Sequence, residues 1–218
     1  MSKDGRIWLS HSGIEGLSRC PRCFWLAYHK GIRQPEGIVS RLANRFDTVL
    51  KNYFNSFRPD LPPMVEGKLE GKLQDPFVET YFVTIDNKYG FYGKLDECLV
   101  SKSQELIPID FKTSSSDPRG KETLDAYQAQ IDDYNFILKQ NNKKIAGWGY
   151  LIYVFPDHSK YLHKGFPMIV HIVKLIGKPQ NTAKRIAQAI TVLEGKMPLS
   201  NKDCNFCSWF DKIQSELE

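Results

Sequence analysis

The 218-residue chain has no apolar run close to the roughly 20 residues that a membrane-spanning helix needs. Its first ten residues, MSKDGRIWLS, lack the basic-then-apolar pattern of a secretory signal. It also has no internal repeat, no low-complexity tract and no Ser/Gly-rich linker. These absences argue against a helical membrane protein, a secreted protein and a repeat array, so we expect one cytoplasmic domain over residues 1–218.

The chain also lacks a strong charge imbalance, since it has 30 basic and 25 acidic residues and a net charge of +5. A mildly basic balance suits a polyanionic partner, but it is common in proteins that touch no nucleic acid. The five histidines show no ligand spacing, and we assign them no chemistry. A content of 41% hydrophobic and 25% charged residues is typical of a globular protein.

The pattern of apolar residues predicts alternating helices and strands. Apolar residues recur at helical spacing over residues 39–57, 123–141 and 179–193, and a further helix is expected over 12–28. Ser12 and Glu15 would form a capping box for that first helix, and Pro21 would break it near Cys20. Strands are predicted at residues 77–85, 89–100 and 105–113, as a meander, and at 147–155 and 166–176. Residues 58–76 are expected to form a loop, and the residues after Gly195 a tail. This order predicts an α/β fold with a mixed central β-sheet flanked by helices.

One predicted hairpin carries charges among residues that otherwise suit a buried sheet. In ELIPIDFKT (residues 105–113), strand alternation places Ile107, Ile109 and Phe111 on one face and Asp110 with Lys112 on the other. A turn centred near Ser103 would set residue 100 opposite 106, residue 98 opposite 108 and residue 96 opposite 110. Asp96 would then face Asp110 across the hairpin.

Two facing carboxylates predict a cation between them. Directly opposed residues have Cβ atoms about 4.5–5.5 Å apart, and like charges at that distance destabilise a sheet. Mg²⁺ prefers carboxylate oxygens, and Lys112 on the same side could assist a water or a phosphate. The alternative is a solvated salt bridge between Asp96, Asp110 and Lys112 at the surface.

Three motifs in order resemble the PD-(D/E)XK nuclease superfamily, specifically its RecB-like branch. GKLDECLV supplies Gly93 and Asp96, PIDFKT supplies Asp110 to Lys112, and YQAQIDDY supplies Gln130 and Tyr134. The likeness covers roughly residues 39–153, and the nuclease core would extend over about 39–176. It implies that Asp96, Asp110 and the Phe111 carbonyl bind Mg²⁺ or Mn²⁺ and that Lys112 is catalytic. Gln130 and Tyr134, four residues apart on one helical face, would steady Lys112 or the nucleic-acid backbone.

The chain departs from the family at one expected ligand. RecB-like nucleases commonly have a His on the helix before the hairpin, whereas LANRFDTVLKNYF has Asp47 at about that place. A carboxylate also binds Mg²⁺ or Mn²⁺, so Asp47 is a candidate further ligand. The alternative is an exposed Asp on a helix surface.

Four of the five cysteines form two Cys-x-x-Cys pairs, CPRC (Cys20, Cys23) and CNFC (Cys204, Cys207). Four thiolates complete a tetrahedral metal site, which would join the terminal segments 12–30 and 196–210. The spacing does not separate zinc from an iron–sulfur cluster. The resemblance favours a 4Fe-4S cluster, as in the nucleases of CRISPR adaptation, although their usual one-plus-three split of ligands differs from the two-plus-two split here. Cys98 is expected to be a small buried residue.

The sequence therefore predicts a metal-dependent deoxyribonuclease. Candidate phosphate contacts are Arg41, Arg45, Lys94, Arg119 and Lys121, each of which is alternatively an ordinary surface residue. The resemblance implies an exonuclease acting on single-stranded DNA or DNA ends in CRISPR spacer acquisition or DNA repair, with a CRISPR integrase or a helicase as partner. The alternative is a non-catalytic DNA-binding subunit with a nuclease fold and a structural zinc site.

Overall fold

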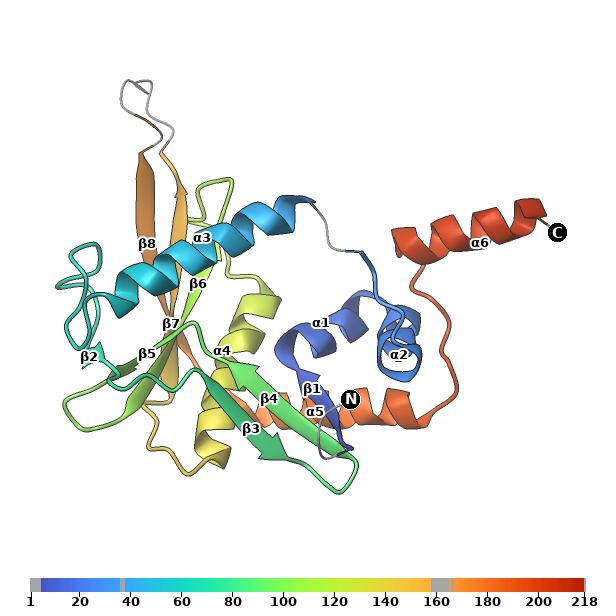
Figure 1. Ribbon diagram of the computed structural model, residues 1–218, viewed down its shortest axis with the longest axis horizontal. Helices are drawn as coiled ribbons and strands as arrows, with labels where there is room; N and C mark the ends of the chain where they lie inside the picture. The colour runs from blue at the N-terminus through green and yellow to red at the C-terminus, as the bar shows by residue number, and fades with distance from the viewer. Residues whose placement is uncertain (1–4, 36–37, 158–164, 166, 218) are drawn as a thin grey trace.

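The computed structural model describes residues 5–35, 38–157, 165 and 167–217, and it contains two sheets surrounded by helices (Figure 1). The helices are α1 (His11–Arg19), α2 (Pro21–Lys30), α3 (Ile38–Asn55), α4 (Asp125–Gln140), α5 (Pro179–Glu194) and α6 (Asn205–Leu217). The smaller sheet has the order β1-β4-β3, from β1 (Ile7–Ser10), β3 (Thr80–Thr84) and β4 (Tyr89–Lys94). The larger has the order β2-β5-β6-β7-β8, from β2 (Lys72–Leu73), β5 (Glu97–Val100), β6 (Leu106–Thr113), β7 (Trp148–Pro156) and β8 (Met168–Ile176). Parallel and antiparallel pairs both occur, so the predicted mixed α/β fold is confirmed.

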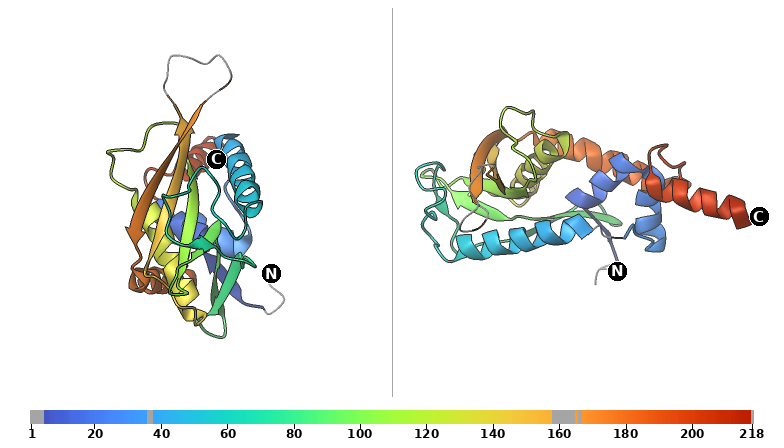
Figure 2. Two further views of the ribbon diagram at one scale, coloured as in Figure 1. Left: turned by 90° about the vertical axis from the view of Figure 1, so that its left-hand side faces the viewer. Right: turned by 90° about the horizontal axis from the view of Figure 1, so that it is seen from above.

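Helices cover both faces of the larger sheet. Seen from above, α3 lies on one side of the sheets and α4 with α5 on the other (Figure 2). Leu50 and Phe54 of α3 pack in one apolar cluster with Ile107, Ile109 and Phe111 of β6. Residues of α4 belong to a second cluster with the opposite faces of β4 and β7. The predicted alternation along β6 is therefore confirmed.

The predicted three-stranded meander is wrong, because residues 89–100 form two strands in different sheets. β4 pairs with β1 and β3, whereas β5 pairs with β6. The chain changes sheets at Leu95 and Asp96, where the fully buried Leu95 donates its backbone N–H to Glu79 O (2.8 Å). The predicted register of the hairpin holds, since Val100 pairs with Leu106 and Cys98 with Pro108. An apolar period that continues through Leu95 hides this change of sheet.

The start of α1 and two further elements differ from the prediction, whereas two other predictions hold. The N-cap of α1 is Ser10, whose Oγ accepts the Gly13 N–H (3.3 Å), so the predicted capping box of Ser12 and Glu15 is wrong. The predicted break at Pro21 is confirmed, because α2 starts there. The predicted loop contains the short strand β2, and the predicted tail contains α6. The predicted strand over 166–176 is β8, although residue 166 lies outside the described residues.

In the part of the chain that the structure describes, no helix is both long and apolar enough to cross a membrane.

Candidate active site and cysteine centre

Asp110 lies inside β6, between β5 and β7, and its side chain is completely buried. Its Oδ1 accepts a hydrogen bond from the Tyr134 hydroxyl (3.2 Å). Its Oδ2 lies 2.5 Å from Lys112 Nζ and has no other polar partner among the described residues. Burial and the nearby charge of Asp96 raise the pKa of Asp110 to about 7, against the opposing effect of Lys112. Asp110 is therefore a buried carboxylate that is short of positive charge.

Asp96 sits where the chain passes from β4 to β5, beside the centre of β6. Its Oδ2 accepts the backbone N–H of Phe111 (2.9 Å), the residue next to Asp110. Its Oδ1 lies 2.8 Å from Lys51 Nζ. The sequence register thus placed Asp96 correctly beside Asp110, and the change of sheet is what turns its side chain toward the β6 backbone.

Lys51 of α3 is a site residue that the sequence analysis missed. Its ammonium bridges Asp47 Oδ2 and Asp96 Oδ1, each at 2.8 Å. Burial disfavours its charged form, but Asp96 and Asp47 outweigh that effect and raise the pKa of Lys51. The i, i+4 spacing of Asp47 and Lys51 was visible in the sequence, whereas nothing in it linked Lys51 to Asp96.

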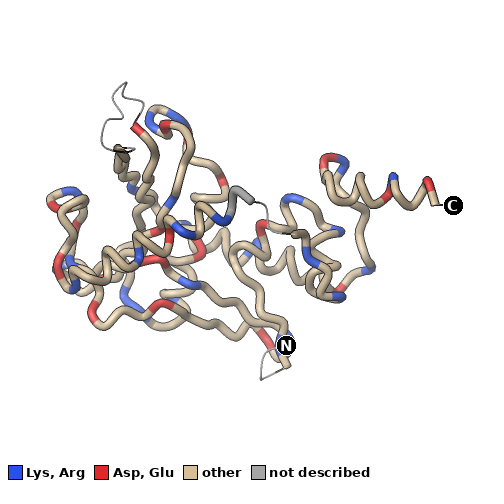
Figure 3. Tube along the Cα trace, turned by 45° about the horizontal axis from the view of Figure 1, so that its top comes forward, with Lys and Arg blue, Asp and Glu red and all other residues tan. Residues whose placement is uncertain are grey.

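Among the described residues, the Lys51 ammonium is what connects Asp47 to Asp96. Asp47 lies on α3 with 36% of its side chain exposed, and it is held by the Lys51 ammonium. Among the described residues, the carboxylate oxygens of Asp47, Asp96 and Asp110 do not form one close group of three, and the cysteines are the group that does. The structure therefore brings Asp96 and Asp110 together and leaves Asp47 at the edge. Acidic residues gather where α3 crosses the sheets (Figure 3).

A chain of hydrogen bonds joins Lys112 to α4. Lys112 Nζ donates to Gln130 Oε1 (2.7 Å), and Gln130 Nε2 donates to the Tyr134 hydroxyl oxygen (2.9 Å). The Tyr134 hydroxyl can in turn donate to Asp110 Oδ1 or to Lys94 O, both at 3.2 Å. The Lys112 ammonium also lies 4.7 Å from the centre of the Tyr127 ring. The predicted trio of Lys112, Gln130 and Tyr134 is thus one connected network, closed through Asp110.

The donors beside β6 fit a small divalent cation. Mg²⁺ is usually bound by one or two carboxylates, and its remaining positions are filled by water and substrate. Asp96 and Asp110 supply two carboxylates, and the Asp110 Oδ2 atom has spare capacity as an acceptor. Lys51 already places one positive charge against Asp96. Residues of this kind can bind a cation and hold an ammonium next to a phosphate.

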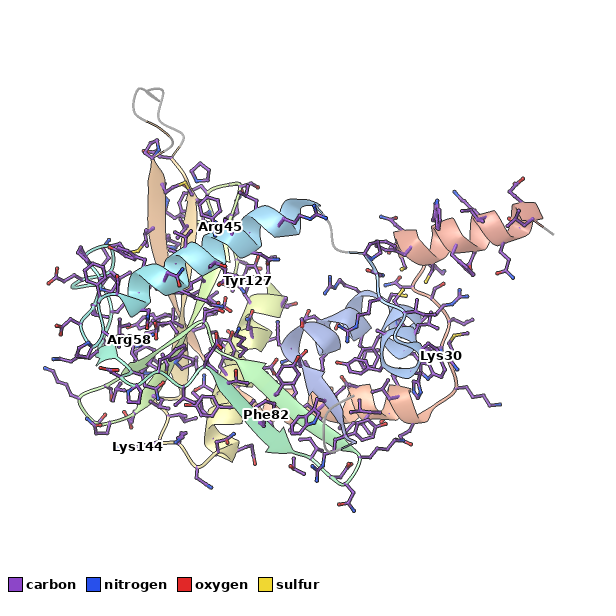
Figure 4. All side chains as sticks on the ribbon, in the orientation of Figure 1. Lys30, Arg45, Arg58, Phe82, Tyr127 and Lys144 are labelled. Carbon is purple, nitrogen blue, oxygen red and sulfur yellow. The ribbon has the colours of Figure 1, made fainter. Side chains whose placement is uncertain are left out.

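The five predicted phosphate contacts lie on three parts of the chain: α3, the end of β4 and the loop between β6 and α4. Arg41 and Arg45 are exposed on α3, and Figure 4 labels Arg45 on that helix. Lys94 is paired with Glu79 (3.1 Å), two residues before Asp96. Arg119 and Lys121 are exposed in the loop between β6 and α4, where they contact Asp117 and Ser116 respectively. Only Lys94 is tied to the site, through its carbonyl.

The four predicted cysteines converge from opposite ends of the chain. Cys20 lies between α1 and α2, Cys23 lies in α2, and Cys204 and Cys207 lie just before and within α6. Their four Sγ atoms all lie within 4.8 Å of one another, and three of the distances are 3.9 Å (Cys20–Cys207), 3.7 Å (Cys23–Cys204) and 3.5 Å (Cys23–Cys207). The predicted joining of the two ends by a four-cysteine cluster is confirmed.

These sulfur spacings fit a single metal ion. A tetrahedral ion with metal–sulfur bonds of about 2.3 Å has neighbouring sulfurs about 3.8 Å apart. A four-iron cluster places a separate iron behind each thiolate, which spreads the sulfurs well beyond the observed 4.8 Å. Burial opposes ionisation of Cys20, but hydrogen bonds from the backbone of Cys23 and Asn201 outweigh it and lower the pKa of this thiol to about 7.

Ordinary contacts reinforce the joint between the ends. Arg22 Nη1 donates to Asp211 of α6 (3.1 Å), and Trp25 Nε1 donates to Gly195 O (3.1 Å). The His29 ring lies 2.9 Å from Leu193 O. Helix α2 is therefore attached to both α5 and α6, on either side of the cysteine cluster.

No protein-family model matches the chain, and no curated protein matches it in sequence. Three solved structures are similar in part of their architecture. The crystal structure of SSO0001 has a TM-score of 0.49 and 17% identity, over 95% of this chain and 84% of that one. The structure of a phage-related exonuclease from Haemophilus somnus 129PT has a TM-score of 0.46 and 13% identity, over 91% of this chain and 82% of that one. The structure of an alkaline exonuclease from Laribacter hongkongensis has a TM-score of 0.48 and 8% identity, over 98% of this chain and 95% of that one.

Proposed function

We propose that the protein is a divalent-metal-dependent deoxyribonuclease that hydrolyses phosphodiester bonds. The observation that carries the proposal is the buried Asp110, with Asp96 on one side, the Lys112 ammonium 2.5 Å away and one unsatisfied acceptor capacity. Two carboxylates and a lysine arranged in this way suit hydrolysis of a phosphate ester, because a cation and an ammonium neutralise charge on the transferring phosphate.

Asp96 and Asp110, with the Phe111 carbonyl, would hold Mg²⁺ or Mn²⁺, and Asp47 would be a further ligand. A cation bound there supplies positive charge at the scissile phosphate and lowers the pKa of the attacking water. Lys51 neutralises Asp96 and Asp47 in the metal-free protein, so it would have to release at least one of them.

Lys112 would act at the attacking water or the scissile phosphate. Its ammonium is held by Gln130 Oε1 and Asp110 Oδ2 and rests on the Tyr127 ring, so it has little freedom to point elsewhere. Gln130 is the positioning residue for Lys112, and Tyr134 fixes the amide of Gln130. A fixed ammonium stabilises developing negative charge without reorganising during the reaction.

DNA is the proposed substrate, held at its phosphates by Arg41, Arg45, Lys94, Arg119 and Lys121. We further propose a RecB-like nuclease domain with its core over about residues 39–176. It would act in the cytoplasm as an exonuclease on single strands or DNA ends. The pathway would be CRISPR spacer acquisition or DNA repair, with a CRISPR integrase or a helicase as partner. These finer assignments follow from the motif resemblance.

We propose zinc as the occupant of the cysteine centre, in place of the 4Fe-4S cluster that the resemblance favours. Sulfur spacings of 3.5–3.9 Å support a single tetrahedral ion. The role would be structural, because all four positions are filled by thiolates and none is open for a substrate.

The test is cleavage of end-labelled single-stranded and double-stranded DNA with Mg²⁺ or Mn²⁺. Asp110→Asn and Lys112→Gln should each lower the rate by about 10²–10⁴-fold, the range that one proton-transfer or charge-stabilising group contributes. Lys102→Gln is the matched control, because Lys102 is an exposed lysine in the turn between β5 and β6. This variant should cleave DNA at the rate of the wild type. Wild-type protein that binds DNA but never cuts it would favour the DNA-binding subunit instead.

A further inference from the structure

The outer face of the smaller sheet is aromatic. Leu9, Tyr89 and Phe91 point into the apolar cluster beneath α4, so alternate residues of the same strands point outward. The pairings Trp8–Gly90, Ser10–Tyr92 and Phe82–Tyr92 set those outward residues side by side. The Phe82 and Tyr92 rings are stacked at 5.9 Å, and Trp8 meets Phe82 edge-on at 5.2 Å. Phe82 is 56% exposed, and Figure 4 labels it on the β3–β4 hairpin.

A cavity of about 460 Å³ adjoins this face, where α1, α2 and the segment after α2 surround it. Its walls include Trp8, Tyr92 and Phe24, and two exposed arginines, Arg19 and Arg33. Neither arginine forms an ion pair with any described residue. Gly16 of α1 also lines the cavity, and a Cβ atom there would meet nothing within 4 Å. Flat aromatic walls beside uncompensated guanidinium groups suit a ligand with rings and negative charge.

The aromatic face leads directly to the candidate active site. Tyr92 and Lys94 point outward from β4, and Asp96 follows where the chain leaves that strand and contacts Lys51 of α3. The carbonyl of Lys94 is hydrogen-bonded to the Tyr134 hydroxyl, which also contacts Asp110. Residues two apart in a strand are about 7 Å apart. Tyr92 precedes Asp96 by four residues, so their Cα atoms are at most about 13 Å apart.

We infer that this cavity and aromatic face bind unpaired nucleotides of the DNA strand next to the phosphate that is cut. This inference rests on the proposed function and adds a substrate subsite to it. The bases would stack on Tyr92 and Trp8, and their phosphates would contact Arg19 and Arg33. Stacking of this kind requires bases free of a partner strand, so the subsite selects single-stranded DNA and tolerates any sequence.

Binding is tested in the Asp110→Asn background, so that the DNA stays intact. The probe is a fluorescein-labelled oligothymidylate of about 12 nucleotides, within the roughly 4–16 nucleotides that a small single-strand-binding domain covers. Tyr92→Leu and Arg33→Ala should each weaken binding by about tenfold, since one stacked base or phosphate contact is lost. Tyr92→Phe keeps the ring and should bind as before. Trp209→Ala removes an aromatic on α6 that is 66% exposed and should also leave binding unchanged.

A second pair of variants tests the cavity itself. Gly16→Phe should fill it and weaken binding, whereas Gly16→Ala should not, because the added methyl group has open space around it. Photocrosslinking of an oligonucleotide carrying 5-iodouracil should label Tyr92 or Trp8, as mapped by mass spectrometry. Circular dichroism and thermal melting show whether each variant is folded.

The outcomes separate this inference from the proposed function. If wild-type protein cuts DNA while the Tyr92→Leu, Arg33→Ala and Gly16→Phe variants bind and cut like it, the subsite is wrong and the nuclease proposal stands. Crosslinks confined to other surfaces would overturn it in the same way. Wild-type protein that neither binds nor cuts DNA would overturn both. Equal binding of duplex and single strands would contradict the selection of unpaired bases.

Discussion

Asp110 combines complete burial with one cationic neighbour, and this combination controls when the site can accept a cation. Its pKa is raised to about 7 from an ordinary value of 3.8, first by burial and then by the charge of Asp96. Lys112 and the Tyr134 hydroxyl oppose the shift but do not cancel it. Without a cation, Asp110 therefore keeps its proton between about pH 4 and pH 7, where most carboxylates are ionised.

Cation binding should accordingly weaken as the pH falls below about 7, because Asp110 then has to release its proton. The expected loss is roughly tenfold in apparent Mn²⁺ affinity per pH unit. Titration calorimetry between about pH 6 and pH 8, in buffers of different ionisation enthalpy, measures the protons released on binding. Close to one proton per ion at the acidic end would agree, and none would contradict the prediction.

The same shift predicts the sign of a stability effect in the metal-free protein. A carboxyl whose folded-state pKa lies above its unfolded value destabilises the fold when it ionises. The free energy of unfolding should therefore fall as the pH rises from about 4 to about 7, and the Asp110→Asn variant should lack that part of the decline. Urea denaturation of both proteins over this range measures the difference, and parallel curves would contradict it.

At this scale the sequence predicted what local geometry determines and missed what depends on the tertiary fold. Strand alternation and the turn near Ser103 were sufficient to set Asp96 beside Asp110. The contact between Lys51 and Asp96 depends on how α3 lies across the sheet. That packing follows from Leu50 and Phe54 meeting β6, which no spacing within the helix reveals.

Helix α4 brings two glutamines of different purpose to the sheet. Gln130 contacts Lys112 and Tyr134, at the candidate site. Gln128, half a turn away, binds Asp132 and the Ile176 carbonyl (both 2.8 Å), at the joint with β8. Gln130 therefore positions Lys112, whereas Gln128 supports the fold.

Replacing Gln130 by Ala should lower kcat by about tenfold, in the range for a residue that orients a catalytic group. KM should change little, because Gln130 contacts Lys112 and Tyr134 and is not one of the proposed phosphate contacts. Gln128→Ala is the matched control: it should lower the melting temperature and leave kcat close to that of the wild type. Equal kcat values in the two variants would contradict the role of Gln130.

The elements show where a periodic pattern is an incomplete guide. Residues 89–95 keep one apolar alternation, yet the chain divides into β4 and β5 just after it, where Leu95 is fully buried in the core. Helix α6 was missed although Phe206, Phe210 and Ile213 recur at helical spacing. This spacing indicates a helix within the predicted tail.

At the scale of the whole molecule, the cysteine centre joins residues that are 181–187 positions apart. The sequence predicted this joint correctly from two Cys-x-x-Cys pairs, because four thiolates in a short chain have few other uses. It could not distinguish zinc from a cluster, since that choice depends on the distances between sulfurs. Those distances are set by the packing of α2 against α5 and α6.

Loss of the ion should destabilise the fold without removing any catalytic group. The ion binds the folded chain, in which the four sulfurs converge, far better than the unfolded chain, so its removal should lower the free energy of unfolding by roughly 4 kcal/mol or more. The measurement compares urea denaturation of the wild type, with and without a zinc chelator, and of a Cys20→Ser/Cys207→Ser variant. Metal analysis should find one zinc per chain in the wild type.

Cys98 provides the matched control for this prediction. It is fully buried in β5, away from the other four cysteines, and burial raises its pKa to about 12, so it is a poor thiolate. Cys98→Ala should keep one zinc per chain and lose only packing energy, and the chelator should destabilise it as much as the wild type. Iron with sulfide, found after anaerobic purification, would overturn the single-ion assignment. An unchanged unfolding curve after complete removal of the metal would show that the contacts of α2 alone hold the two ends together.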